Sequence, residues 1–140
     1  AQGKISSEPV YAPDLYPTLL RAAGLSDQAQ AGLDGVDFTP LLQNPDATLK
    51  REALYFHYPH YYQTTTPVSA LRKGDWKLLE YYEDNRLELF NLKQDPGETQ
   101  DISTANPALA RRLRMELDVW RKKIGAQLPE PNPDWKPRRK

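Results

Sequence analysis

Two histidines and one arginine are the residues whose types and positions most readily predict chemistry in this sequence. His57 and His60 lie in the aromatic run HYPHY at residues 57–61, and Arg72 lies in a stretch of strand-forming residues. Imidazole and guanidinium groups beside tyrosines are typical of a polar, aromatic rim that holds an anion or a carbohydrate. We therefore predict that His57, His60 and Arg72 form part of a substrate-binding rim.

Each candidate also has a structural interpretation. His57 is equally well explained as an aromatic strand residue that hydrogen bonds to the backbone, and Arg72 as one half of a cross-strand ion pair. Trp76 offers a surface for stacking on a ligand, but a tryptophan in a strand is more often a core residue. A zinc site needs three or four ligands, and no carboxylate motif of suitable spacing accompanies the two histidines, so we predict no metal site.

Catalytic motifs are missing from the sequence. There is no cysteine, and therefore no disulfide, thiolate ligand or cysteine nucleophile. We find no serine with a suitable histidine and acid, no glycine-rich phosphate loop and no paired-carboxylate signature. The sequence therefore predicts an α+β module with no catalytic residue of its own.

The composition limits the classes of partner that this chain could bind. The 140 residues carry a formal net charge of zero, so no overall field favours nucleic acid or an anionic membrane. No apolar run approaches the roughly 18 residues of a membrane span, and no signal segment opens the chain. The sequence begins Ala-Gln-Gly-Lys without an initiator methionine, and we expect it to be a piece of a longer protein. We predict neither a nucleic-acid nor a membrane partner.

The elements that would position the candidates include three or four antiparallel strands. Residues 76–82 and 87–92 are apolar, β-prone runs separated by the polar turn at residues 83–86, which predicts a hairpin. Residues 68–73 lie just upstream and extend it to a meander. Residues 53–58 predict a further strand, and the proline-bounded residues 59–67 predict a loop.

Helices complete the predicted fold. Asn106 and Pro107 predict the start of a long helix that ends near residue 124, with a single apolar stripe: Leu109, Leu113, Leu117, Trp120 and Ile124. We interpret its basic remainder as solvated. Asp14 is the predicted cap of a short helix that stops at Gly24, and Thr39 begins one or two further turns. The predicted class is α+β: a small antiparallel sheet of three to four strands packed against a long C-terminal helix, preceded by a short helix.

An ordered set of motifs then resembles a known family. These are VYAPDLYPTLL with AAG at residues 10–24, LDGV at 33–36, FHYPHY at 56–61, SALRKGDWKL at 69–78, ELFNL at 88–92 and DPGE at 95–98. Together they resemble the C-terminal part of a type I, formylglycine-dependent sulfatase of the arylsulfatase family, over roughly residues 8–135.

The resemblance implies a sulfuric ester hydrolase whose large α/β domain carries formylglycine and calcium, with a smaller domain of four antiparallel strands and a helix. The family's nucleophile motif is Cys or Ser, any residue, Pro, any residue, Arg. The nearest match, residues 7–11, has Tyr11 where arginine belongs, and the calcium carboxylates are absent. We therefore expect the chemistry to lie upstream and this chain alone to be inactive.

The resemblance also implies an organisation and partners. We assign residues 1–45 to the last segment of the catalytic domain or a connector, 46–127 to the sulfatase C-terminal domain, and 128–140 to an extended, proline-rich tail. The expected partners are the missing N-terminal catalytic domain and a sulfated small molecule or glycan. The implied location is periplasmic or secreted.

Two other classes of function are weighed against this one. A stand-alone carbohydrate-binding or interaction module would use the aromatic loop and the basic helix face by themselves. An exposed apolar patch around the first helix would instead favour a domain severed from its partner. Nucleic-acid binding through the helix arginines is opposed by the zero net charge.

Overall fold

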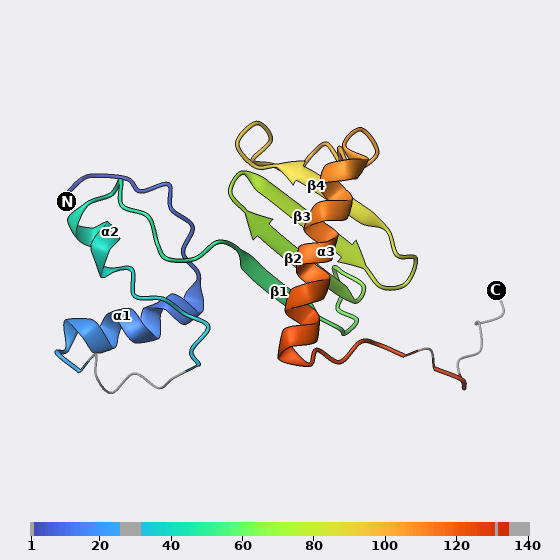
Figure 1. Cartoon of the computed structure of the whole chain (residues 1–140), viewed down its shortest axis with the longest axis horizontal. Helices are drawn as coiled ribbons and strands as arrows, with labels where there is room; N and C mark the ends of the chain where they lie inside the picture. Colours follow the sequence, from blue (N-terminus) through green and yellow to red (C-terminus); the bar gives the residue numbers. More distant parts are fainter. Residues whose placement is uncertain (1, 26–31, 131, 135–140) are drawn as a thin grey trace. The chain divides into compact units, whose positions relative to one another are not determined.

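The computed structural model describes residues 2–25, 32–130 and 132–134. Contacts between residues divide the chain into two compact units, Ala1–Arg51 and Glu52–Lys140. The first contains short helices and the second contains a sheet and a long helix (Figure 1). None of the described helices is long and apolar enough to cross a membrane.

The first unit holds the 3-10 helix η1 (Ala12–Asp14) and the helices α1 (Leu15–Ala22) and α2 (Thr39–Gln43). Proline suits the first turn of a helix because the amide hydrogen that it lacks would be unpaired there, and α2 has Pro40 at this place. The two short helices are those that the sequence predicts.

A buried carboxylate joins the parts of this unit. Asp14 stands at the N-terminus of α1 as predicted, but its side chain makes no cap hydrogen bond and is instead fully buried. Arg51 donates to both of its oxygens, at 2.7 and 3.0 Å, and the backbone amides of Tyr11 and Val36 donate at 3.0 and 2.9 Å. The carboxylate therefore connects three segments, around residues 11–14, 36 and 51, rather than capping one helix.

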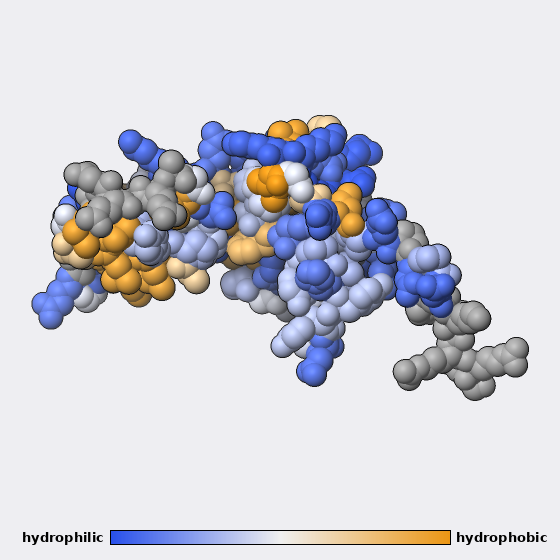
Figure 2. Space-filling model, turned by 90° about the horizontal axis from the view of Figure 1, so that it is seen from below, coloured by the Kyte–Doolittle hydropathy of each residue, from blue (hydrophilic) through white to orange (hydrophobic). Residues whose placement is uncertain are grey.

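The outer side of α1 is apolar and exposed. Leu15, Tyr16 and Leu19 are about half exposed or more, at 51%, 49% and 64%. Figure 2 shows apolar side chains gathered on the surface of this unit. The first helix thus carries an exposed apolar patch, and patches of this kind typically mark an interaction site.

The second unit contains four strands and one helix. The strands are β1 (Leu54–Tyr58), β2 (Val68–Lys73), β3 (Trp76–Tyr81) and β4 (Leu87–Asn91), paired antiparallel in the order β1-β2-β3-β4. The helix α3 (Pro107–Ile124) ends at Gly125, whose left-handed φ of 63° is typical of a glycine C-cap. The predicted sheet and long helix are confirmed.

The apolar core lies between α3 and one face of the sheet (Figure 1). Each of the three strands β2 to β4 contributes one fully buried leucine, and the helix adds three residues; the cluster is Leu71, Leu78, Leu89, Ala110, Leu113 and Leu117. Tyr55 at the sheet edge stacks on Trp120 with ring centroids 5.0 Å apart. Four of the five predicted stripe residues pack here, whereas Ile124 is 51% exposed because the helix ends there.

The two edges of the sheet differ. Beside β4, the loop before α3 continues the pairing: the Leu89 amide donates to Asp101 Oδ1 at 2.9 Å, and the Ile102 amide donates to the Leu89 carbonyl at 2.9 Å. On the other side, β1 is the last strand of the sheet among the residues described.

Candidate functional site

Strand register separates the three predicted site residues. His57 pairs with Ser69, which shares the helix-covered face with Leu71, because side chains two apart in a strand point the same way. Arg72 follows Leu71 directly and therefore points to the opposite face. His60 lies beyond the end of β1, in the loop. The structure thus does not bring these residues together into one cluster.

His57 belongs to a hydrogen-bonded chain that crosses the end of the sheet. Its Nδ1 lies 2.8 Å from Ser69 Oγ and 3.0 Å from the Tyr82 hydroxyl, the two hydroxyls are 2.5 Å apart, and Arg121 donates to Tyr82 at 2.9 Å. His57 Nε2 lies 2.9 Å from the carbonyl of Gln127. Because a carbonyl only accepts, Nε2 carries the proton and Nδ1 is the acceptor. The ring therefore ties the segment after α3 to the sheet.

The contact between Ser69 and His57 is structural. The serine is fully buried, so no substrate reaches its hydroxyl, and the histidine's other nitrogen is occupied by the Gln127 carbonyl. A nucleophilic serine needs an accessible hydroxyl and a base that is free to pass its proton on. We assign this pair to holding Gln127, in the segment after α3, against the sheet.

A buried ion-pair network continues from Tyr82 along the helix. Arg121 and Glu80 are almost fully buried and pair at 2.7 Å, while Arg121 also pairs with Asp118 and Arg114 pairs with Glu80 at 2.7 Å. Burial opposes the charge of Arg121, but hydrogen bonds with Asp118 and Tyr82 and the charge of Glu80 outweigh it and raise its pKa. The interpretation of the basic helix face as solvated is wrong for Arg121, which lies four residues after the core residue Leu117 and so shares its face.

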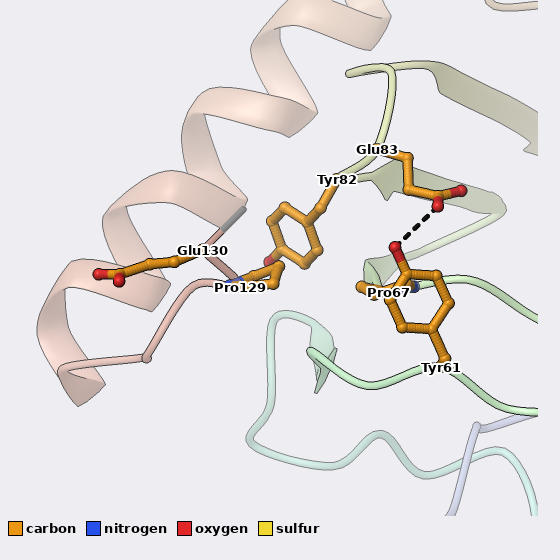
Figure 3. A pocket seen from close by; sticks show the side chains of 6 residues that line it. All are labelled: Tyr61, Pro67, Tyr82, Glu83, Pro129 and Glu130. Atoms are coloured by element: carbon orange, nitrogen blue, oxygen red, sulfur yellow. Dashed lines mark hydrogen bonds between the residues drawn. The ribbon is translucent and has the colours of Figure 1, made fainter. Parts of the chain in front are cut away.

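At the end of this network lies a hollow of about 300 Å³ (Figure 3). Two tyrosines, two prolines and two glutamates line it: Tyr61, Pro67, Tyr82, Glu83, Pro129 and Glu130. They come from the β1–β2 loop, the end of β3 and the segment after α3. The Tyr61 hydroxyl donates to Glu83 Oε1 at 2.8 Å, and this bond raises the pKa of Tyr61. We call this the tyrosine–proline hollow.

A second hollow, of about 400 Å³, has a different lining. It shares Tyr61 with the tyrosine–proline hollow and adds the hydroxyl-rich loop at residues 62–66, Tyr81 and Arg86. The guanidinium of Arg86 stacks on Tyr81, 3.9 Å from the ring centroid, and pairs with Glu88 and Asp84. The residues around the two hollows thus differ in charge: glutamates alone in the first and an arginine in the second.

The remaining predicted residues have different surroundings. His60 meets Tyr58 edge to face, with ring centroids 5.6 Å apart. Arg72 faces Leu54 on one neighbouring strand and Lys77 on the other, and Lys77 in turn bonds to Glu98. The Nε of Arg72 is buried and has no hydrogen-bond partner among the residues that the structure describes. The cross-strand ion pair considered for Arg72 is therefore not found in that part of the chain.

The sequence interpretation missed most of the tyrosine–proline hollow. It placed His60 and the neighbouring tyrosines in an aromatic rim, and of these residues Tyr61 lines the hollow. Glu83 was assigned only to a turn, and Pro129 and Glu130 only to the tail. Their place depends on the contact between His57 and Gln127, for which the sequence contains no signal. The only usable signal was the density of tyrosines in the loop.

Among residues 2–25, 32–130 and 132–134, no group of three or more His, Cys, Asp or Glu side chains is placed to hold a metal ion. Calcium prefers six to eight oxygen ligands. The residues described therefore do not fit a calcium site, and none of the roles assigned to them involves a metal.

Comparison with protein families places the chain. A family model described as N-sulphoglucosamine sulphohydrolase, C-terminal, matches residues 1–123. A sulfatase of Formosa agariphila is 30% identical in an alignment 129 positions long, which covers 82% of this chain and 23% of that protein. Arylsulfatase K of Rattus norvegicus is 30% identical over 113 residues, 74% of this chain and 19% of its own length.

Comparison of structures gives the same picture. A solved structure described as a 2-O GAG sulfatase superposes with a TM-score of 0.67 at 25% identity, over 81% of this chain and 25% of that one. The chain thus spans about a quarter or less of the length of the proteins that it matches.

Proposed function

Since this chain belongs to the N-sulphoglucosamine sulphohydrolase C-terminal family and is the C-terminal domain of a sulfatase, we propose that the whole protein hydrolyses sulfate esters. The match over residues 1–123 carries this proposal. The substrates would be aryl sulfates or sulfated glycans, in keeping with relatives described as arylsulfatase K and a 2-O GAG sulfatase. The nucleophile would lie outside this chain, because Tyr11 replaces the arginine of the family motif.

The role of this chain in such an enzyme would be to support the catalytic domain. Residues 1–45 would be the last segment of that domain or a connector, and residues 46–127 would be the C-terminal domain proper. This role is supported by the exposed apolar side chains of α1, Leu15, Tyr16 and Leu19. Exposure of such a surface to water is unfavourable, and a domain packed over it would bury it.

The substrate rim of the whole enzyme would lie near the three residues predicted from the sequence, His57, His60 and Arg72. Each of them would have a different role. His57 would position the segment after α3 through Gln127, and His60 would lie on the aromatic loop itself. Arg72 would meet an anion from outside the described residues, because its buried Nε lacks a partner among them and an unpaired buried donor is costly. Alanine at His60 in the whole protein should then lower turnover of the natural substrate with little change in stability.

The resemblance places formylglycine and calcium in the catalytic domain, where they would supply the nucleophile and the sulfate-binding charge. Among the described residues, no group of His, Cys, Asp or Glu side chains is placed to hold a metal ion. A periplasmic or secreted location is proposed on the same family basis.

Sulfatase activity is the test of this proposal. The full-length protein and the 140-residue chain are assayed side by side on an aryl sulfate and a panel of sulfated sugars. We expect activity in the full-length protein alone. An inactive full-length protein, prepared with formylglycine formed, would contradict the proposal, and activity in the chain alone would contradict its assignment of the nucleophile.

A second candidate, a carbohydrate-binding module, is favoured by one observation. The aromatic loop carries Tyr61 and Tyr62, which are 69% and 64% exposed, beside threonine hydroxyls. Exposed tyrosines stack on sugar rings. Binding of a sulfated sugar by the 140-residue chain, combined with inactivity of the full-length protein, would favour this function over the first.

A further inference from the structure

We propose that the tyrosine–proline hollow binds an amino sugar through its protonated amine. The inference stands whether or not the full-length protein is a sulfatase. It rests on the charge of the hollow, the shape of its walls and the contact that holds one wall in place.

The negative charge of the residues that line the hollow favours a positively charged ligand. The two lining residues that are charged near neutral pH, Glu83 and Glu130, are carboxylates, and no lysine or arginine is among the six lining residues. Neither glutamate forms an ion pair with any residue in the described parts of the chain. Figure 3 shows the Glu83 carboxylate beside Tyr61, whereas the Glu130 carboxylate points away from the other lining residues. A sulfate placed beside Glu83 would therefore meet a like charge, whereas an ammonium group would meet an opposite one.

One carboxylate is already oriented for this task. Tyr61 donates to Oε1 of Glu83, which fixes the side chain on the wall of the hollow (Figure 3). The other oxygen, Oε2, remains to accept a hydrogen bond from a ligand. A charge-assisted hydrogen bond from an amine to a carboxylate is stronger than one between neutral groups.

The walls of the hollow suit a ring rather than a bare ion. Tyr61 and Tyr82 present aromatic rings and Pro67 and Pro129 present pyrrolidine rings, so the hollow has flat apolar surfaces beside its polar groups. The volume of about 300 Å³ is at the small end for ligand sites, which matches a single sugar unit. The apolar face of a sugar ring can stack on such walls while its amine reaches Glu83.

His57 acts as a positioning residue for this site. Its Nε2 donates to the Gln127 carbonyl, and Pro129 and Glu130 follow two and three residues later. On its other side His57 is held by Ser69 and Tyr82, and Tyr82 is itself a wall of the hollow. One imidazole therefore fixes two walls relative to each other.

Binding to the 140-residue chain tests the inference. Glucosamine, glucose and glucose 6-sulfate are titrated separately near neutral pH and followed by amide chemical shifts or calorimetry. We expect glucosamine to bind, with shifts centred on Tyr61, Tyr82 and Glu83, and glucose to bind about tenfold more weakly, since it lacks the charged hydrogen bond. Glucose 6-sulfate should give no shifts at these residues.

Matched variants locate the binding. Glu83→Gln removes the charge of an exposed residue while keeping its size, and should weaken glucosamine binding about tenfold. Asp75→Asn removes an exposed charge at the opposite end of β3, and should leave binding within about twofold. Unchanged tryptophan emission in both variants shows that the fold is retained.

Three results would overturn the inference. Glucose 6-sulfate binding at these residues as tightly as glucosamine would contradict the assigned charge preference. Lysine amide binding as tightly as glucosamine would show that the walls do not recognise a sugar ring. Equal binding by the Glu83→Gln variant and the native chain would exclude the named carboxylate.

Discussion

Two buried carboxylates, Asp14 in the first unit and Glu80 in the second, are each bound by arginine but stabilise different kinds of structure. Glu80 pairs with Arg121 beside a core of leucines from three strands and a helix. Asp14 pairs with Arg51 in a unit whose buried apolar side chains, among its described residues, are Leu41 and Leu49. The comparison indicates that a polar centre organises the first unit, whereas an apolar core with an added polar network organises the second.

The hydrogen-bond partners of Asp14 stabilise its ionised form. Burial alone would raise the pKa of Asp14, but the hydrogen bonds from Arg51 and from the amides of Val36 and Tyr11 outweigh it, and the pKa is lowered. The ionised form is therefore the one that the folded unit prefers.

Removing the Asp14 carboxylate should have the largest effect. Asp14→Ala leaves Arg51 buried without its anion and should destabilise the first unit by about 3 to 5 kcal/mol. Hydrogen exchange followed by mass spectrometry measures the loss of protection in each unit. Protection should collapse in residues 2–25 and 32–51, while emission from Trp76 and Trp120 in the second unit stays unchanged. Equal losses in both units would refute the comparison.

A core truncation should affect the second unit in the same way. Leu78→Ala removes a fully buried side chain between β3 and α3 and should cost about 2 to 5 kcal/mol, measured by urea unfolding with tryptophan emission. Leu42→Ala, at a site that is 58% exposed in α2, is the control and should change stability little. Similar midpoints for native chain and Leu78→Ala would show that the leucine core does not organise this unit.

Neutralising Glu80 should lower the free energy of unfolding by less than Asp14→Ala or Leu78→Ala. Glu80→Gln keeps the shape, and Arg121 retains Asp118 and Tyr82 as partners, so we expect about 1 to 3 kcal/mol in the same urea experiment. A loss as large as that from Asp14→Ala would mean that both units depend on their polar centres alike.

Lowering the pH should destabilise the first unit more than the second, by a smaller amount than the substitutions above. Because the pKa of Asp14 is lower folded than unfolded, its contribution to stability is full above the unfolded pKa of about 4 and is lost as pH falls through the folded pKa. Hydrogen exchange corrected for its intrinsic pH dependence should show the first unit losing protection on acidification below pH ~4. Asp14→Asn should flatten this dependence, and an unchanged profile in that variant would exclude Asp14 as its source.

The regular elements were predictable because their signals are local. The β-prone runs at residues 76–82 and 87–92 around a polar turn predict β3 and β4, and the spacing of Leu113 and Leu117 predicts the buried face of α3. The sheet, the long helix and the two short helices therefore followed from the sequence.

The polar centres and the hollow were not predictable because they join distant segments. Asp14 and Arg51 are 37 positions apart, and His57 and the Gln127 carbonyl are 70 apart. Asp14 precedes a helix and therefore resembles a cap, and Arg121 lies in a basic run and therefore resembles a solvated residue. Which of these side chains is buried depends on tertiary packing, which local patterns do not encode.

The two edges of the sheet differ in whether another strand could pair with them. Asp101 and Ile102 already occupy the hydrogen-bonding groups of Leu89 in β4, so a further strand has no place on that side. Among the described residues β1 is the other outer strand, so a strand supplied by another chain or domain would extend the sheet on the β1 side. Any extension of the sheet is then one-sided, and a proline placed in β1 would be the means to stop it.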